Sequence, residues 1–185
     1  ALAYMFFPVP VLLQKMGILP YVEEKLKQTI EIIETVSKEN SPEVPLKKNK
    51  AKTIATQILG TIPVIYGFRQ YACVAHRLKA QFNENSKVPS KSELFPELNH
   101  NETVGYDGPT NLLDKLSVIL IRDPEEPMEI TNRIEITAEL VFNKAKSVTE
   151  ITAQGQTKLA KMFSVLCLGD YVSVYLAVLQ NKDPT

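Results

Sequence analysis

Apolar residues form a continuous run from Ile62 to Tyr66, which is bounded by Gly60 and Gly67. Such an unbroken run predicts a strand that is covered on both faces, as in a parallel sheet. After the second glycine, apolar residues recur at helical spacing, which predicts an amphipathic helix directly after the strand. The apolar positions of this helix are Tyr71, Val74, Ala75, Leu78 and Phe82. A strand, a glycine turn and a helix together form half of a crossover unit.

The same alternation continues along the chain. Unbroken or alternating apolar residues predict strands over 116–121 and 147–151, and helical spacing predicts helices over 129–146 and 156–179. Two amphipathic helices precede the first strand, one beginning at Tyr21 and one whose apolar positions lie between Ala51 and Ile58. Strands that alternate with helices at intervals of roughly thirty residues favour right-handed crossovers. The predicted fold is therefore α/β, a three-layer α/β/α domain with an open parallel sheet.

The segment from Ala1 to Leu13 is hydrophobic, but Pro8 and Pro10 interrupt it and no basic residues precede it. It is too short to span a bilayer, so we interpret it as a short hydrophobic helix or linker. The chain does not begin with Met, and we expect this segment to pack on a part of the protein upstream of position 1. The predicted organisation is a helical interdomain linker and the end of an N-terminal domain over 1–46, followed by one α/β/α domain over 47–185.

Composition narrows the classes of function. The 21 basic and 21 acidic residues cancel, which argues against nucleic-acid or membrane-surface binding, because both rely on a positive field. Cys73 and Cys167 lie in apolar helical patterns without C-x-x-C spacing, so we interpret them as small buried residues of a cytoplasmic protein. With two histidines and no H-E-x-x-H motif, the sequence does not favour a metal centre.

Two polar clusters carry the candidate chemistry, Asn83-Glu84-Asn85 and the stretch from Asn99 to Glu102. A carboxylate and a histidine in one cleft could act as general base and acid, and the amides could hold sugar hydroxyls. Ligands bind beyond the carboxyl ends of parallel strands, so we expect residues 67–70 to face a pocket and Glu84 and His100 to lie at that edge. The alternative for Glu84 is a solvated helix end. The candidate side chains are Glu84, Glu97, His100, Glu102, Arg69 and Arg77, with Arg69 a candidate phosphate ligand.

Several motifs give the chain a family resemblance. They are I-P-V-I-Y-G, R-L-K-A-Q-F-N-E-N-S-K, F-P-E-L-N-H-N-E-T-V-G-Y, I-L-I-R-D and D-Y-V-S-V-Y-L-A-V-L. With them, nearly the whole chain resembles the C-terminal sugar isomerase (SIS) domain of the archaeal and bacterial bifunctional phosphoglucose/phosphomannose isomerases, together with the linker before it. That family also has a first SIS domain, whose serine- and threonine-rich loop binds the substrate phosphate, and a helical tail with a catalytic lysine. Nothing in these residues matches that loop, and we expect the tail to follow Thr185.

The resemblance implies an aldose-ketose isomerase of glycolysis and gluconeogenesis that needs no redox cofactor. It implies that Glu84 transfers a proton between C2 and C1 through a cis-enediol, and that His100 assists ring opening from the neighbouring subunit of a homodimer. The implied substrates are glucose 6-phosphate, mannose 6-phosphate and fructose 6-phosphate. The residues that we expect to bind the substrate are Arg69, Asn83, Asn99 and Thr185.

Two alternatives stay open at this point. One is a non-catalytic SIS module that senses sugar phosphates, and the other is an SIS isomerase for a different phosphosugar. The clusters around Glu84 and His100 favour an enzyme, because a sensor does not need a positioned carboxylate and histidine.

Overall fold

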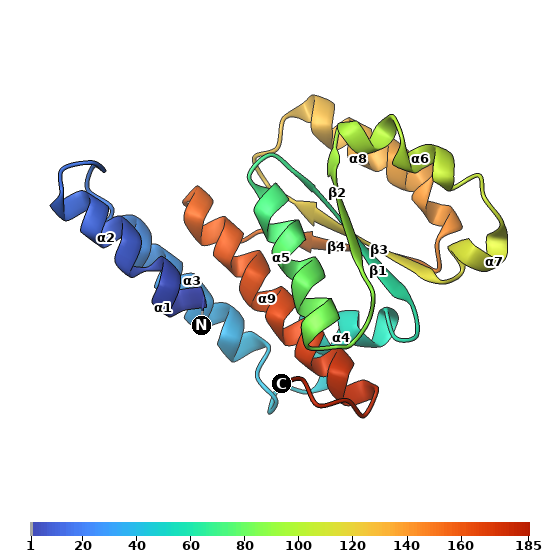
Figure 1. The fold of residues 1–185 in the computed structure, drawn as a ribbon, viewed down its shortest axis with the longest axis horizontal. Coiled ribbons are helices and arrows are strands. Elements are labelled where there is room, and N and C mark those ends of the chain that lie inside the picture. Colours follow the sequence, from blue (N-terminus) through green and yellow to red (C-terminus); the bar gives the residue numbers. More distant parts are fainter. Residues whose placement is uncertain (1) are drawn as a thin grey trace.

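The computed structural model describes residues 2–185 and contains a four-stranded parallel sheet with the strand order β2-β1-β3-β4 (Figure 1). In the register of the two central strands, Ile65 lies opposite Ile119. The predicted parallel α/β fold is thus confirmed. The strands are β1 (Ile62–Phe68), β2 (Lys91–Phe95), β3 (Leu116–Arg122) and β4 (Ser147–Thr152).

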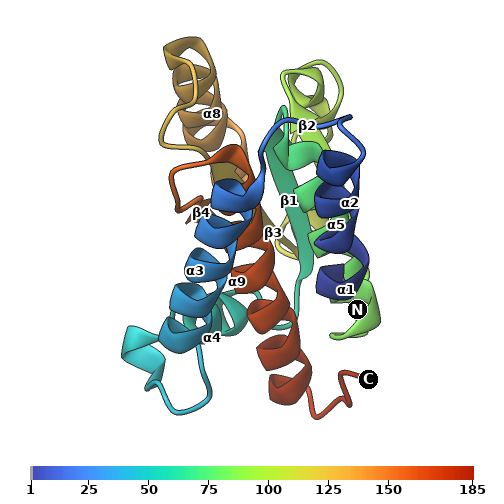
Figure 2. The same ribbon diagram turned by 90° about the vertical axis from the view of Figure 1, so that its left-hand side faces the viewer.

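Helices cover both faces of this sheet, because successive side chains of each central strand point to opposite sides. Ile65 belongs to one hydrophobic core and its neighbour Tyr66 to the other. The helices of the first face are α3 (Glu23–Glu39), α4 (Lys50–Gln57), α5 (Tyr71–Glu84) and α9 (Lys158–Leu179), and Figure 2 shows α3 and α9 side by side. The second face carries α6 (Glu102–Gly105), α7 (Thr110–Leu113) and α8 (Met128–Leu140), with the 3-10 turns η2 (Glu97–Asn99) and η3 (Phe142–Lys144).

Helix α9 is the central helix of the first face. By length and composition alone it could cross a membrane, but more than half of its apolar stretch is buried inside this domain. Contacts with α3, α4, α5 and the sheet therefore account for its apolar character. Helices α9 and α5 pack tightly at Gly169, where a Cβ atom would overlap the Leu78 side chain of α5.

The structure differs from the sequence prediction at β2 and at α8. Strand β2 was not predicted, because it is a short edge strand whose K-S-E-L-F sequence has no apolar run and buries only Phe95. The helix predicted over 129–146 ends at Leu140, and a 3-10 turn then leads to β4. The one-turn helices α6 and α7 also lie in a region for which only turns were predicted.

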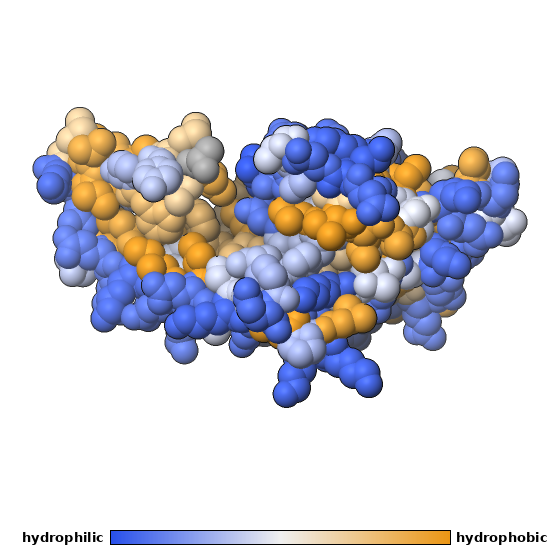
Figure 3. Space-filling model, turned by 90° about the horizontal axis from the view of Figure 1, so that it is seen from below, coloured by the Kyte–Doolittle hydropathy of each residue, from blue (hydrophilic) through white to orange (hydrophobic). Residues whose placement is uncertain are grey.

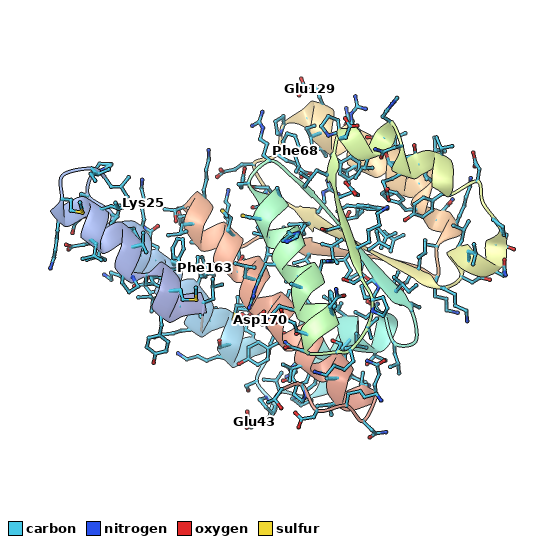
Figure 4. All side chains as sticks on the ribbon, in the orientation of Figure 1. Lys25, Glu43, Phe68, Glu129, Phe163 and Asp170 are labelled. Carbon is cyan, nitrogen blue, oxygen red and sulfur yellow. The ribbon has the colours of Figure 1, made fainter. Side chains whose placement is uncertain are left out.

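The N-terminal residues form α1 (Leu2–Phe6) and α2 (Pro8–Lys15), which confirms a short hydrophobic helical segment. The rings of Phe6 and Phe7 lie 5.2 and 5.5 Å from that of Phe163 on α9, which Figure 4 labels. Figure 3 shows hydrophobic residues gathered at this end of the molecule. Large apolar side chains here that are more than half exposed are Tyr4, Met5, Leu12, Met16, Ile18 and Tyr21. Between this segment and the first strand lies the 3-10 turn η1 (Leu46–Lys48).

Candidate functional site

The strand order creates a crevice between β1 and β3. From β1 the chain continues to β2 on one side, and from β3 it continues to β4 on the other, so the connections that follow β1 and β3 diverge at the carboxyl ends of these two strands. Ligands of open parallel sheets bind at such a point. A pocket of about 90 Å³ lies there, and Phe68, Arg69 and Gln70 line it, which confirms the expectation for the segment after β1. The other lining residues are Tyr71, Ile121, Asp123, Glu125, Glu126, Pro127 and Lys158.

Arg69 has the backbone geometry of a tight turn at this crevice. Its φ of 49° is in the left-handed region, which a residue other than glycine adopts only where the surrounding structure imposes it. The exposed guanidinium lies 4.9 Å from the ring centre of Phe68, a residue labelled in Figure 4. Arg69 therefore presents a positive charge to solvent at the mouth of the crevice.

Asp123 is the centre of a hydrogen-bond network inside the crevice. Its carboxylate accepts hydrogen bonds from the Tyr71 hydroxyl at 2.8 Å, from Gln70 Nε2 at 3.1 Å and from Lys161 Nζ at 3.0 Å. Burial alone would raise the pKa of Asp123, but the hydrogen bonds from the Glu125 backbone N–H, Tyr71 and Lys161 outweigh it and hold the pKa below its usual value. For Tyr71, burial and the Asp123 carboxylate both raise the pKa of the hydroxyl. The network thus stabilises a charged Asp123 and a neutral Tyr71.

The partner of Asp123 is a buried lysine that the sequence analysis missed. The Lys161 side chain is only 4% exposed and also lies 2.7 Å from Glu125. Two features could have indicated it: Lys161 interrupts an apolar helical pattern, and Asp123 directly follows a strand. Burial lowers the pKa of Lys161, whereas the bonds to the two carboxylates raise it above its usual value by a larger amount.

The size of this crevice limits what it can bind. Sites for drug-sized ligands and cofactors typically occupy about 300–1,000 Å³. The crevice has about 90 Å³, and its inner polar groups bond to one another. It is therefore too small, in this state, to enclose a hexose phosphate.

Glu84 does not lie at this edge of the sheet, so the expectation that placed it there was wrong. Helix α5 starts next to the carboxyl end of β1, runs back along the sheet and ends at Glu84, shortly before Lys91 begins β2. The carboxyl-edge rule applies to the loop after a strand and not to the far end of the helix that follows it. Glu84 is exposed at the amino edge.

Two other predicted residues share the surroundings of Glu84. The Asn83 side-chain oxygen accepts a hydrogen bond from the Ser90 backbone N–H at 3.0 Å, which fixes the loop between α5 and β2. Lys87 Nζ donates to the carbonyl oxygens of Glu84 at 2.6 Å and Thr185 at 3.2 Å. The structure thus brings Asn83, Glu84 and Thr185 together.

His100 and Asn99 lie on the opposite face. Leu98 of η2 is fully buried in the second core, and Asn99 Nδ2 donates to Thr137 Oγ1 of α8 at 2.9 Å. The His100 side chain, next in the chain, is exposed. The predicted site residues therefore occupy three places in one chain: the crevice with Arg69, the amino edge with Glu84, and this face with His100.

The remaining candidate residues and the two cysteines differ in how far they are buried. Glu97 is exposed on η2, and the partly buried Arg77 has an Nε atom without a hydrogen-bond partner among residues 2–185. Cys73 is exposed, so its interpretation as a buried residue was wrong, whereas burial raises the pKa of Cys167. Over residues 2–185, no group of three or more His, Cys, Asp or Glu side chains is arranged to hold a metal ion.

Comparison with protein families decides the relationship. Residues 47–185 match a family model described as the bacterial phospho-glucose isomerase C-terminal SIS domain. The chain belongs to this family. A bifunctional phosphoglucose/phosphomannose isomerase of Caldicellulosiruptor bescii is 37% identical over the whole chain, which covers 55% of that relative. One from Thermoplasma acidophilum is 38% identical over 75% of the chain and 44% of its own length. The chain thus spans about half the length of the curated relatives it matches.

Solved structures share the fold of this SIS domain. A glucose-6-phosphate isomerase like protein from Thermus thermophilus superposes with a TM-score of 0.76 at 24% identity, over 94% of this chain and 57% of its own. The C-terminal domain of glucosamine-fructose-6-phosphate aminotransferase from Francisella tularensis gives a TM-score of 0.60 at 16% identity, over 87% and 45% of the two chains. At these identities the likeness concerns the fold alone.

Proposed function

We propose that this chain is the second SIS domain, over 47–185, and the preceding linker, over 1–46, of a cytoplasmic bifunctional phosphoglucose/phosphomannose isomerase. The enzyme interconverts glucose 6-phosphate or mannose 6-phosphate with fructose 6-phosphate, a reaction of glycolysis and gluconeogenesis. The observation that carries this proposal is the 37% identity over the whole chain to an isomerase of that name. The exposed positions of Glu84 and His100, both accessible to a substrate, support it.

Glu84 is the proposed base. Its carboxylate removes the proton from C2 of the open-chain aldose, the C1 carbonyl oxygen gains a proton, and a cis-enediol forms. Glu84 then returns the proton to C1 while the C2 hydroxyl loses its proton and becomes the carbonyl of the ketose. One carboxylate performs both transfers, so glucose and mannose phosphates, which differ at C2, can share the site.

His100 is the proposed acid-base group for ring opening, and it acts in a site of the neighbouring subunit. The separation of Glu84 and His100 onto opposite faces of one sheet supports a homodimer in which each site combines the two subunits. The small volume of the crevice supports the same arrangement, because a hexose phosphate needs walls from another domain or subunit.

The proposed substrate-binding residues have free polar atoms available. Asn83 uses its side-chain oxygen within the chain, so its exposed amide nitrogen remains for sugar hydroxyls. Asn99 donates from its nitrogen to Thr137, and its side-chain oxygen is buried without a hydrogen-bond partner among residues 2–185. Thr185 lies near Glu84, because Lys87 Nζ donates hydrogen bonds to the backbone carbonyl oxygens of both residues. A role for Arg69 in binding phosphate is supported by its place at the crevice alone.

A test of the proposed base uses Glu84→Gln in the complete gene product, with isomerisation followed in deuterated water. We expect both sugar phosphates to lose turnover by about 10²-fold or more, with loss of solvent deuterium at C1 and C2 and near-normal substrate affinity. Glu139→Gln, an exposed position on α8, is the control and should keep normal rates. Near-normal turnover of Glu84→Gln would reject Glu84 as the base and direct attention to Glu97 and Glu102.

The two alternative functions make different predictions. A sugar-phosphate sensor would bind its ligand without turnover. An SIS isomerase for another phosphosugar would turn over that substrate faster than the hexose 6-phosphates. We expect no binding to nucleic acid or membranes, in line with the equal numbers of basic and acidic residues.

A further inference from the structure

Polar anchors hold the segment that carries His100, in addition to the burial of Leu98 and Tyr106 in the second core. Helix α6 follows His100 after one residue and has a single turn of four residues, which has no stability of its own. A hollow of about 240 Å³ lies between α6 and the sheet. Its walls include Ile62, Val64, Leu113 and Leu116. Along this hollow α6 lacks apolar contacts with the strands, so its polar bonds contribute to its position.

One hydroxyl group bridges both ends of this turn. The Tyr66 hydroxyl of β1 lies 3.3 Å from the carboxylate of Glu102, the first residue of α6, and 3.1 Å from the hydroxyl of Tyr106, its C-cap. Glu102 also accepts a hydrogen bond from Lys91, the first residue of β2, at 2.5 Å. Two strands therefore hold the start of α6 through one carboxylate.

Tyr66 is itself rigidly placed. Its side chain is 1% exposed, and its ring stacks on Phe142 with a centroid distance of 4.8 Å. Burial, together with the neighbouring Tyr106 and Glu102, raises the pKa of Tyr66, so the hydroxyl stays protonated and can donate a hydrogen bond. Burial likewise raises the pKa of Tyr106 to about 12. The anchor thus keeps its proton over the whole physiological range.

We propose that Tyr66 is a positioning residue for His100, acting through Glu102 and α6. His100 lies between two fixed points: Asn99, bonded to Thr137 of α8, and Glu102, bonded to Tyr66. Figure 1 shows α6 and α8 on the same side of the sheet. The anchoring of α6 by Tyr66 does not depend on the proposed function. Only the expected effect on catalysis by His100 rests on that function.

The test compares Tyr66→Phe with Tyr175→Phe. Each substitution removes one phenol hydroxyl and keeps the ring, but Tyr175 bonds to the Asn40 carbonyl on the other face of the domain. In amide hydrogen exchange, Tyr66→Phe should speed exchange in α6 by about 10- to 100-fold, as expected when a hydrogen bond to a charged group is lost. Tyr175→Phe should leave α6 unchanged. Unchanged exchange in α6 of Tyr66→Phe would overturn the inference.

A second readout separates positioning from the proposed chemistry. In the complete gene product, Tyr66→Phe should lower kcat for the cyclic sugar phosphates and largely spare an open-chain substrate, with little change in KM. Glu102→Gln, which keeps one carbonyl oxygen as an acceptor and so one of the two hydrogen bonds, should behave more like wild type than Glu102→Ala. Faster exchange in α6 with unchanged kcat for the cyclic substrates would contradict the proposed role of His100 and leave the anchoring by Tyr66 established.

Discussion

Glu84 and His100 lie on opposite faces of the same sheet. Two residues before Glu84, Phe82 is buried in the core of the first face, and two residues before His100, Leu98 is buried in the core of the second. Both side chains are exposed. A site that uses both groups is therefore expected to form from two chains, and the following predictions concern first this domain and then that assembly.

Replacement of Asp123 should strongly destabilise the domain. Asp123→Asn removes the buried one of the two carboxylates that Lys161 faces and leaves the exposed Glu125, while the Lys161 side chain is only 4% exposed. Breaking a buried ion pair from one side costs about 3 kcal/mol or more. The control is Asp107→Asn, which breaks an exposed pair with Lys144 and should cost less than about 1 kcal/mol. Urea unfolding of both variants measures the difference, and equal stabilities would show that the crevice network contributes little.

The contribution of Asp123 should depend on pH in one direction. Its pKa in the folded protein lies below the usual value, so its stabilising effect is complete above the pKa of the unfolded chain and is lost as pH falls through the folded pKa. The gap in free energy of unfolding between wild type and Asp123→Asn should be constant between about pH 5 and 7 and should narrow below about pH 4. Unfolding curves across this range check it, and a gap that widened with acid would have the wrong sign.

Gly169 should not tolerate a methyl group. The Cβ atom of Gly169→Ala would overlap Leu78, which is 1% exposed and has little room to move. We expect a net loss of about 1–2 kcal/mol, because overpacking outweighs the gain in helix propensity. Gly105→Ala meets no atom within 4 Å and should be neutral or slightly stabilising. Thermal unfolding of the two variants provides the comparison, and a stabilised Gly169→Ala would mean that α5 and α9 separate easily.

The two thiols should react at different rates. Cys73 is exposed, whereas burial raises the pKa of Cys167 and lowers its thiolate fraction. A chromogenic disulfide reagent should give a fast phase and a slow phase in the folded protein, and Cys73→Ser should remove the fast one. Loss of the slow phase instead would indicate that the first turn of α5 is covered in solution.

Hydrophobic pattern was sufficient to predict the central strands and the long helices, because burial on both sides leaves a continuous apolar run in β1 and β3. The pattern did not predict β2, because a strand at the edge of the sheet is less buried and does not need a continuous apolar run. Motif resemblance selected Glu84 and His100, but linear sequence could not indicate that α5 carries Glu84 away from the carboxyl edge. The Asp123–Lys161 pair was missed, since 38 residues separate its members and only the fold brings them together.

The most direct test of a shared site mixes two inactive variants of the complete gene product. Dimers with Glu84→Gln in one subunit and His100→Ala in the other contain one site with both groups intact. If subunits exchange freely, half of the dimers are mixed, and one of the two sites in each mixed dimer is intact. About a quarter of all sites are then intact, so the mixture should gain about a quarter of wild-type activity beyond the activities of the two variants measured separately. Mixing Glu84→Gln with the double variant is the control and should restore nothing. An equimolar mixture that exchanges subunits but gains no activity would contradict a site built from Glu84 of one chain and His100 of another.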